Sequence, residues 1–306
     1  MNIVLLCATQ RGFRFLKQLH SLCSSDKLTI FSFRETPWEP KFLDDIQGFC
    51  STNNLTFFAT RNVFDKKYND VWSVGIDLAF FVHWRYIVPI SALSYVKQSV
   101  VFHDSLLPVY RGFSPTVWAM INGEQKCGAS MFYLANEVDT GDIIDQEEVI
   151  IKPEETIFQV MDKVTEAYLN LLTNNIQALR IGQAPRTQQD HSRATYGCKR
   201  TPEDNLIDWQ QPTQVIYNLI RAVGFPYTGA YTYYKGTKVI VWSAIPYLKV
   251  GKYVGVIPGK IIEVKPKEGV VVLTVDGALL ISIIQLEGNP KLCASEVIKS
   301  ISDKLG

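Results

Sequence analysis

The chain has 306 residues, of which 47% are hydrophobic and 20% are charged, a composition that excludes an intrinsically disordered protein. Its 31 Lys and Arg residues nearly balance 30 Asp and Glu residues, so no strong overall charge attracts it to nucleic acid or to an anionic membrane. No stretch of the sequence approaches the roughly 20 consecutive apolar residues that a membrane-spanning helix needs.

The first part of the chain alternates short apolar runs with amphipathic segments. The runs lie at residues 2–7, 27–33, 55–60, 77–82 and 99–103. Strands without a polar face are buried on both sides, as in a mostly parallel sheet that helices cover. Helical patterns occupy residues 11–23, 41–53 and 155–179. We therefore expect a doubly wound, Rossmann-like α/β domain over residues 1–190.

The second part of the chain has a different pattern. The polar stretch at residues 182–197 has no periodicity and is typical of a linker. Beyond it, a helical pattern at residues 212–224 precedes several short strand patterns that glycine turns separate. We expect a smaller, β-barrel-like domain, similar to an OB fold, over residues 191–306.

The six cysteines are far apart in the sequence and form no C-x-x-C pair. Most of them lie inside apolar runs, which favours buried free thiols over zinc ligands or disulfides. We therefore expect no metal site. The N-terminal stretch MNIVLLCATQRGF lacks the basic region and the long apolar core of a signal peptide, so we expect a cytoplasmic protein.

The stretch SVVFHDSLLPVYRG, from Ser99 to Gly112, places a histidine at the end of an apolar strand. Val101 and His103 project from one face of such a strand, whereas Phe102 and Asp104 project from the other. Ligands of open parallel sheets gather beyond the carboxyl ends of the strands, so this position favours a functional role for His103. The structural alternative is a core histidine that is bonded to a backbone carbonyl.

The segment from His103 to Ile144 resembles the signature of the folate-dependent formyltransferases, in which H-x-S-L-L-P-x-Y-R-G precedes an acidic D-x-G. The matching residues are His103, Ser105 to Pro108, Tyr110 to Gly112, Asp139 and Gly141. The stretches KRTPEDNLIDW, LIRAVGFPYTGAY and VIVWSA resemble the C-terminal domain of the same family. The resemblance is closest to the branch that formylates amino groups of nucleotide-linked sugars, which includes 4-amino-4-deoxyarabinose formyltransferase.

This resemblance implies that His103 and Asp139 are the catalytic pair. Transfer of a formyl group from 10-formyltetrahydrofolate to an amine requires proton transfer near neutral pH, for which histidine is suited. A carboxylate beside the ring orients it and stabilises its protonated form. The structural alternative for Asp139 is a turn residue.

The resemblance also implies a set of folate contacts. Backbone groups of Arg85, Tyr86 and Ile87 match the positions that the family presents to the pteridine ring, and His83 and Trp84 beside them are either site or packing residues. The further contacts implied are Ser105, Leu106, Leu107, Pro108, Phe113, Asn136 and Asp139. For Arg111, two interpretations stay open: it contacts the acidic tail of the folate, or it supports the loop.

One residue departs from the family pattern. The family has asparagine two residues before the histidine, where its amide can stabilise an oxyanion, and this chain has Val101. Loss of one such donor typically lowers the rate roughly 100- to 1000-fold. The chain is then an enzyme with another donor, a slow enzyme, or a catalytically impaired relative that binds folate or a sugar nucleotide.

The function that the resemblance favours is N-formylation of a nucleotide-linked amino sugar, a precursor of lipopolysaccharide or O-antigen glycans. The alternative is a methionyl-tRNA formyltransferase, in which a basic insertion follows the second strand. In this chain, residues 34–45 carry two cations and four carboxylates, which argues against a tRNA substrate. We therefore expect small-molecule substrates, no nucleic acid and no membrane as partners, and we leave a homodimer open.

Overall fold

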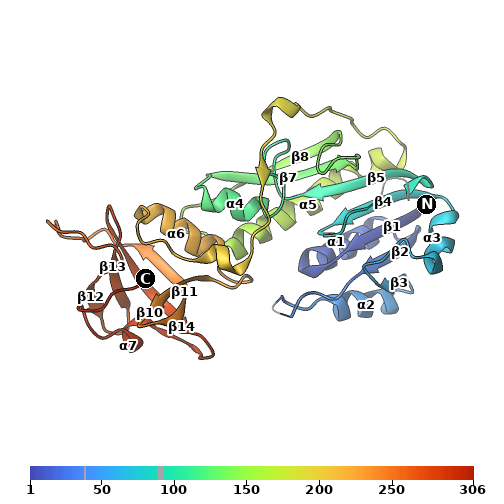
Figure 1. The fold of residues 1–306 in the computed structure, drawn as a ribbon. Helices are drawn as coiled ribbons and strands as arrows, with labels where there is room; N and C mark the ends of the chain where they lie inside the picture. The colour runs from blue at the N-terminus through green and yellow to red at the C-terminus, as the bar shows by residue number, and fades with distance from the viewer. Residues whose placement is uncertain (38, 89–92) are drawn as a thin grey trace. The chain divides into compact units, whose positions relative to one another are not determined.

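The computed structural model describes residues 1–37, 39–88 and 93–306, which fold into two compact units (Figure 1). The first unit consists of Met1–Pro115, Lys126–Ile150 and Met161–Cys198, and the second of Thr116–Gln125, Ile151–Val160 and Lys199–Gly306. The sequence predicted a single domain boundary, after residue 190. In the structure, the long C-terminal segment of the second unit begins at Lys199. The two short segments of the second unit were not expected.

A seven-stranded sheet forms the centre of the first unit. Its strands are β1 (Asn2–Cys7), β2 (Lys27–Ser32), β3 (Thr56–Ala59), β4 (Ile76–Val82), β5 (Val96–His103), β7 (Lys126–Tyr133) and β8 (Ile143–Ile150). Their order is β3-β2-β1-β4-β5-β7-β8, in which the first five strands are parallel and β7 runs antiparallel to β5 and to β8. The predicted doubly wound, mostly parallel sheet is confirmed.

The helices are α1 (Thr9–Leu22), α2 (Leu43–Thr52), α3 (Asn69–Ser73), α4 (Pro115–Ile121), α5 (Ile157–Arg180), α6 (Thr213–Ala222) and α7 (Ala294–Val297). Short 3-10 turns lie at Lys66–Tyr68, His191–Arg193 and Pro202–Asn205. The apolar stripe predicted for the long helix is buried along α5, at Ile157, Val160, Val164, Tyr168 and Leu171.

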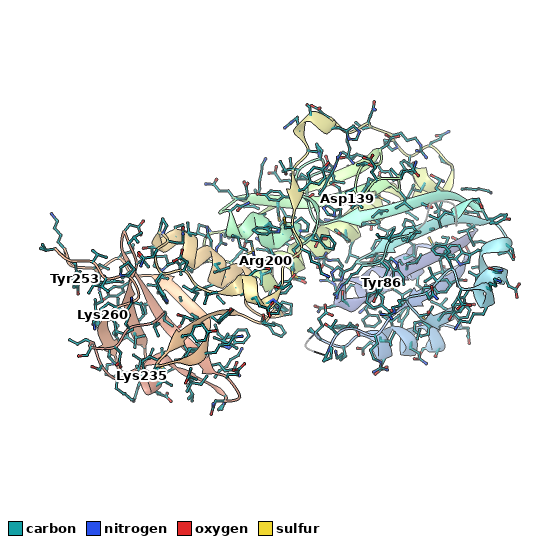
Figure 2. All side chains as sticks on the ribbon, in the orientation of Figure 1. Tyr86, Asp139, Arg200, Lys235, Tyr253 and Lys260 are labelled. Atoms are coloured by element: carbon teal, nitrogen blue, oxygen red, sulfur yellow. The ribbon has the colours of Figure 1, made fainter. Side chains whose placement is uncertain are left out.

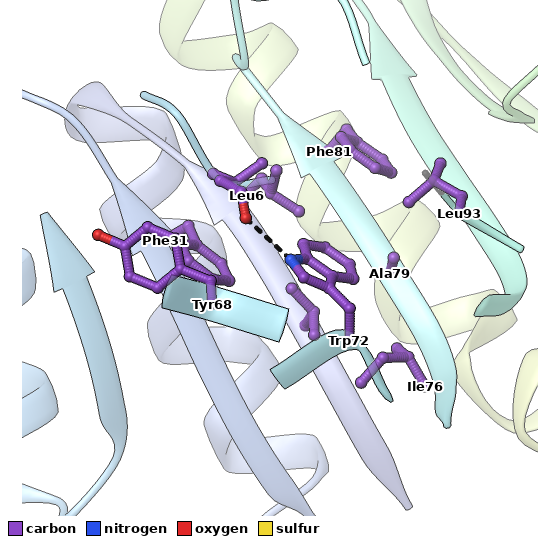
Figure 3. Packing of buried hydrophobic residues seen from close by; sticks show 10 residues of the cluster. Leu6, Phe31, Tyr68, Trp72, Ile76, Ala79, Phe81 and Leu93 are labelled. Carbon is purple, nitrogen blue, oxygen red and sulfur yellow. Dashed lines mark hydrogen bonds between the residues drawn. The ribbon is translucent and has the colours of Figure 1, made fainter. Parts of the chain in front are cut away.

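One face of the large sheet packs against an aromatic cluster around α3 (Figure 3). The rings of Trp72 and Phe31 stack with their centroids 5.8 Å apart, and the Trp72 indole N–H donates to the Val63 carbonyl at 2.9 Å. Phe81 of β4 belongs to this cluster, and Val101 of β5 is half-buried against it. Val101 is therefore part of the packing of this face.

The opposite face packs against α1 and α5. The ring of Phe102 lies 4.9 Å from that of Phe15 in α1 and 5.0 Å from that of Tyr168 in α5, measured between centroids. Asp104 forms an ion pair with Arg11 and accepts a hydrogen bond from the Tyr168 hydroxyl. Phe102 and Asp104 thus lie on the face opposite Val101, as the two-residue period of a strand predicts.

Arg11 and Asp104 form a mostly buried ion pair. Arg11 is 4% exposed, and its Nε donates to Thr165 Oγ1 at 3.1 Å. Burial is the largest single influence on the pKa of Asp104 and raises it, but the charge and hydrogen bond of Arg11, together with smaller contributions from His83 and Tyr168, outweigh burial and hold this pKa well below its ordinary value. The pair therefore ties α1 to the residue that follows β5.

The second unit contains an antiparallel sheet in the order β10-β11-β14-β13-β12, with β15 beside β14. These strands are β10 (Ala230–Tyr234), β11 (Thr237–Pro246), β12 (Ile261–Lys265), β13 (Gly269–Leu273), β14 (Ala278–Leu286) and β15 (Lys291–Cys293). Helix α6 packs beside β11. A β-rich second domain is confirmed.

The two short segments complete the second unit around α6. Arg221 of α6 is buried, and its Nη1 donates to the carbonyls of Lys152 at 3.3 Å and Glu155 at 3.2 Å. The Arg200 guanidinium lies 4.8 Å from the centroid of the Trp118 ring. The two short segments, residues 116–125 and 151–160, therefore supply binding partners for two arginines of the second unit.

All six cysteines are free thiols. Cys7, Cys23, Cys50 and Cys127 are buried as expected, whereas Cys198 is exposed and Cys293 is partly exposed. Within the described residues, no helix is both long and apolar enough to cross a membrane.

We predict that Arg11→Met lowers the free energy of unfolding by about 3–5 kcal/mol, because the Asp104 carboxylate then remains buried without its cation. Urea denaturation measures this change. The double variant Arg11→Met/Asp104→Leu should lose less, since it leaves no unpaired charge. Arg14→Met is the matched control on the same helix, because Arg14 pairs with carboxylates that are mostly exposed and should contribute about 1 kcal/mol or less. Equal losses in the single and double variants would contradict this interpretation.

Candidate active site

His103 is the last residue of β5 and is 9% exposed. Its Nε2 lies 2.8 Å from the carbonyl oxygen of Tyr110, and its Nδ1 lies 3.6 Å from Oδ2 of Asp139. A carbonyl only accepts hydrogen bonds, so this geometry assigns a proton to Nε2. In the neutral ring, Nδ1 then carries the lone pair and faces the carboxylate. The structure thus has the carbonyl bond of the structural alternative, and it also brings His103 and Asp139 together.

Asp139 lies in the loop between β7 and β8 (Figure 2). Its Oδ2 accepts a hydrogen bond from the backbone N–H of Gly112 at 2.7 Å. Gly141 passes so close to β7 that a Cβ atom there would lie 1.7 Å from the Tyr133 carbonyl oxygen. The glycine of the D-x-G motif is therefore required by this close approach, which sets the position of the acid.

Arg111 supports the loop that carries the acid. It is 2% exposed, and its Nη2 donates to Gln189 Oε1 at 2.6 Å. The amide of Gln189 in turn donates to the carbonyls of Asp139 at 2.9 Å and Gly141 at 2.7 Å. Of the two interpretations left open for Arg111, this geometry favours support of the loop.

The strands β6 (Arg111–Gly112) and β9 (Tyr196–Gly197) pair in parallel beside this support. This pairing places part of the polar stretch 182–197 against the motif that ends in Gly112. The stretch is therefore folded onto the site. The sequence interpretation of a simple linker was wrong for this part of the chain.

Hydrogen bonds to β7 and β8 hold the segment from Ser105 to Pro108. The Leu107 N–H donates to Ser130 Oγ at 3.0 Å, and Gln146 Nε2 donates to the Leu107 carbonyl at 2.9 Å. Ser105 and Leu107 are buried, whereas Leu106 and Pro108 are partly exposed. Within this segment, Leu106 and Pro108 are the side chains that remain accessible to a ligand.

The remaining residues with expected folate contacts lie on exposed loops. Ile87 is 90% exposed and Phe113 is 54% exposed, which is unusual for large apolar side chains without a ligand or partner. In the described part of the chain, the side chain of Asn136 is exposed and makes no hydrogen bond. Tyr86 packs edge-on against the ring of Phe33, with centroids 4.9 Å apart.

Arg85 is fixed by an ion pair with Glu39, which lies in the loop after β2. Burial raises the pKa of Glu39, but the hydrogen bonds from Arg85 and Thr36 outweigh it and lower this pKa to about 2. The loops that follow β2 and β4 are therefore joined at the carboxyl edge of the sheet.

His83 is a residue whose role the sequence left undecided. It follows β4 directly, and its Nδ1 lies 2.8 Å from the hydroxyl of Thr9, which begins α1 after β1. From β1 the chain continues to β2 on one side of the sheet, and from β4 it continues to β5 on the other side. In open sheets, ligands bind at the point between two such strands, where the direction of the connections reverses. Burial, followed by the charges of Arg85 and Arg11, lowers the pKa of His83 to about 3. His83 is therefore a neutral ring near neutral pH.

Strained backbone gathers at the same edge. Thr9, His83, Tyr110, Ser114 and Asp139 have positive φ angles of 65°, 53°, 58°, 51° and 57°. Such conformations cost on the order of 1–3 kcal/mol each and persist where the surrounding structure holds them. Three other non-glycine residues of the described chain with positive φ, Asn54, Lys235 and Lys267, lie elsewhere. Within the described residues, no group of three or more His, Cys, Asp or Glu side chains is placed to bind a metal ion.

We predict that His83 makes the folded state less stable as the pH falls. Above its ordinary pKa of 6.5, His83 is neutral in both states, and its contribution is fully present. Between pH 6.5 and about 3, the unfolded chain binds a proton that the folded chain does not, so stability is lost at up to about 1.4 kcal/mol per pH unit. His83→Gln should remove this slope in urea unfolding measured across that range. The same pH dependence in both proteins would refute the assignment.

Two family models match the chain. The model described as "Formyl transferase" matches residues 26–176, and the model described as "Formyl transferase, C-terminal domain" matches residues 199–302. Among curated relatives, a methionyl-tRNA formyltransferase from Moorella thermoacetica is 38% identical over 205 residues. The match covers 66% of this chain and 64% of that relative.

Solved structures share the fold. The sugar 3N-formyl transferase WlaRD, solved in the presence of dTDP and 5-N-formyl-THF, has a TM-score of 0.68 at 17% identity, covering 95% of this chain and 99% of that chain. The N-formyltransferase from Helicobacter canadensis, in complex with folinic acid and dTDP-3-aminofucose, has a TM-score of 0.69 at 17% identity, with 92% and 98% covered.

HypX from Aquifex aeolicus, in complex with tetrahydrofolic acid, has a TM-score of 0.67 at 17% identity and covers 98% of this chain. The chain spans 47% of HypX and 64% of the Moorella relative, so it matches only part of the length of either. At these identities the solved structures show the fold alone. The two family models together match most of the chain, and the chain belongs to the folate-dependent formyltransferase family, whose members are enzymes that transfer formyl groups.

Proposed function

We propose that the protein is a cytoplasmic N-formyltransferase that moves the formyl group of 10-formyltetrahydrofolate to the amino group of a nucleotide-linked amino sugar. The product would be a precursor of a cell-surface glycan. The observation that carries this proposal is the pair formed by His103 and Asp139 at the carboxyl edge of the sheet, with 3.6 Å between Nδ1 and Oδ2.

The roles of the two residues follow from their contacts. His103 Nδ1 accepts a proton from the attacking amine, because its other nitrogen already donates to the Tyr110 carbonyl. The Asp139 carboxylate, which the Gly112 N–H holds in place, stabilises the imidazolium that results. His103 then returns this proton to the nitrogen of the leaving group. When bound, 10-formyltetrahydrofolate supplies the formyl group and leaves as tetrahydrofolate.

The exposed side chains at this edge fit a folate. Ile87 in the loop after β4 and Phe113 directly after β6 present apolar surface, and Leu106 and Pro108 are partly accessible between them in sequence. A flat heterocycle is bound by such apolar surfaces together with a few backbone hydrogen bonds. We propose that Arg85, Tyr86 and Ile87 supply backbone groups for the pteridine ring, and that Asn136 is a further polar contact.

The charges near the site favour a small substrate over tRNA. In the loop after β2, the Lys41 ammonium donates to the carbonyls of Glu35 and Thr36. Arg85 is neutralised by Glu39. Lys41 and Arg85 are already engaged, and of the described residues in this loop only Arg34 is an exposed cation without an ion pair or a side-chain hydrogen bond, whereas a tRNA site needs several lysines and arginines that can bind phosphates. Two neighbours of the same fold were solved with dTDP or a dTDP-linked amino sugar, which supports a nucleotide-linked sugar as the acceptor.

A methionyl-tRNA formyltransferase is the second candidate. The 38% identity to the Moorella thermoacetica enzyme favours it. The two candidates share the formyl donor and the catalytic pair, and they differ in the acceptor. An assay that offers both kinds of acceptor separates them.

We predict that the purified protein formylates a nucleotide-linked amino sugar, and not methionyl-tRNA, with 10-formyltetrahydrofolate as donor. His103→Ala and Asp139→Asn should each lower kcat roughly 100-fold or more, the usual size of a general acid-base contribution. Release of tetrahydrofolate and the mass of the formylated product measure the reaction. Asp142→Asn is the matched control, because this acid lies in the same loop but faces Arg186 at 3.9 Å.

Three outcomes would overturn the proposal in different ways. Formylation of methionyl-tRNA alone would establish the second candidate. Binding of folate without transfer to any acceptor would indicate a non-catalytic binding protein. Near-normal turnover in His103→Ala or Asp139→Asn would remove that residue from the mechanism.

If no other group donates to the oxyanion in this chain, Val101→Asn should raise kcat by roughly 10- to 100-fold. The new amide can donate to the oxyanion, a contact that is stronger in the transition state than in the ground state. The gain stays below that of a native donor because Val101 packs against apolar neighbours that are not shaped for an amide. Steady-state kinetics with the sugar acceptor measure the effect, and Val101→Leu controls for altered packing. An unchanged or lower kcat would show that another donor already serves the oxyanion.

A further inference from the structure

The loop between β11 and β12, residues 247–260, carries several exposed apolar side chains. Leu248 is 93% exposed and Val254 is fully exposed, and large parts of Tyr253, Val256 and Ile257 are also accessible. This loop projects from the sheet of the second unit, and Figure 2 labels Tyr253 and Lys260 on it. Exposed apolar side chains so close together in one loop mark an interaction surface.

The base of the loop is anchored to the sheet. The Tyr247 N–H donates to the Ala278 carbonyl at 2.9 Å, and the Tyr247 hydroxyl donates to Glu263 Oε2 at 3.0 Å. Tyr247 and Val250 pack against the small core of Val271 and Leu273. Some apolar side chains of the loop therefore face the core while others face outward. The side chains that face outward form a second apolar surface on this anchored loop.

The charge of the loop has one sign. Residues 247–260 contain three lysines and no Asp or Glu residue. Lys260 Nζ donates to the Ser302 carbonyl at 2.6 Å. In the part of the chain that the structure describes, neither Lys249 nor Lys252 takes part in an ion pair or a side-chain hydrogen bond. The loop thus combines two available cations with exposed aliphatic side chains.

We propose that the β11–β12 loop docks the protein onto the surface of an anionic lipid bilayer. Aliphatic side chains such as Leu248 and Val254 would enter the boundary between headgroups and acyl chains, and Tyr253 would lie at the level of the headgroups. Lys249 and Lys252 would bind anionic headgroups. This attachment is peripheral. It requires neither a membrane-spanning segment nor a positive charge on the whole chain, the two features on which the expectation of no membrane partner rested.

Two other occupants fit the loop less well. Single-stranded nucleic acid is bound by aromatic rings and arginines, whereas this loop has one ring at its exposed end and four aliphatic side chains. In a symmetric dimer, the same loop of a second copy would bring lysines against lysines with no carboxylate between them. Charge and side-chain type together favour the bilayer.

Flotation with lipid vesicles tests the proposal. The full-length protein should float with vesicles that contain phosphatidylglycerol, should not float with vesicles of phosphatidylcholine alone, and should be released by salt. Leu248→Asp and Val254→Asp should abolish flotation. Each of Lys249→Gln and Lys252→Gln should weaken binding about fivefold, the usual contribution of one cation near an anionic surface. Leu206→Asp, at an exposed aliphatic residue that pairs with β10 instead of the β11–β12 loop, is the matched control and should not change flotation.

Each contrary outcome overturns the proposal. One is the absence of flotation with anionic vesicles at low salt, and another is equal flotation of Leu248→Asp and the wild type. Sedimentation that shows a dimer which Leu248→Asp dissociates would assign the loop to a second copy. RNA binding that is lost in Lys249→Gln and Lys252→Gln would assign it to nucleic acid. Circular dichroism of each variant checks that it is folded, and none of these measurements depends on the proposed formyl transfer.

Discussion

The parallel pairing of β1, β4 and β5 determines where the chemistry of this protein takes place. These strands pair in register, so their carboxyl ends meet at one edge of the sheet. At this edge, Thr9 and His83 lie just beyond the ends of β1 and β4, and His103 is the last residue of β5. Both faces of the sheet are covered by apolar side chains, and a shift of register would expose them. The burial of the sheet therefore fixes which polar groups become neighbours.

The loops around this edge are held largely by bonds to the backbone. The backbone N–H of Gly112 fixes the Asp139 carboxylate, and the side-chain amide of Gln189 donates to the carbonyls of Asp139 and Gly141. His103 is fixed by the carbonyl of Tyr110. Because these partners are main-chain groups, the geometry of the pair depends on the path of the loops more than on the identity of neighbouring side chains. Substitution of a loop glycine such as Gly141 would thus act on the acid indirectly.

The sequence predicted the elements whose pattern is local. Apolar runs indicated the parallel strands, and the stripe of α5 was read correctly from its period. It did not predict β7 and β8, because β7 contains Gly, Ala and Ser, and β8 carries a run of polar residues. The role of Arg111 in supporting the Asp139 loop could not be predicted from the sequence either, since its partner Gln189 is 78 residues away. Such contacts depend on how the whole chain folds, and a single sequence has no local signal for them.

The make-up of the second unit limits how the chain can be divided for study. Residues 199–306 alone would lack Trp118, against which Arg200 lies, and the Lys152 and Glu155 carbonyls that satisfy Arg221. A buried guanidinium without acceptors is costly. A recombinant fragment cut at the end of the polar stretch would therefore be poorly folded, and chimeric proteins that exchange the C-terminal domain need to exchange residues 116–125 and 151–160 with it.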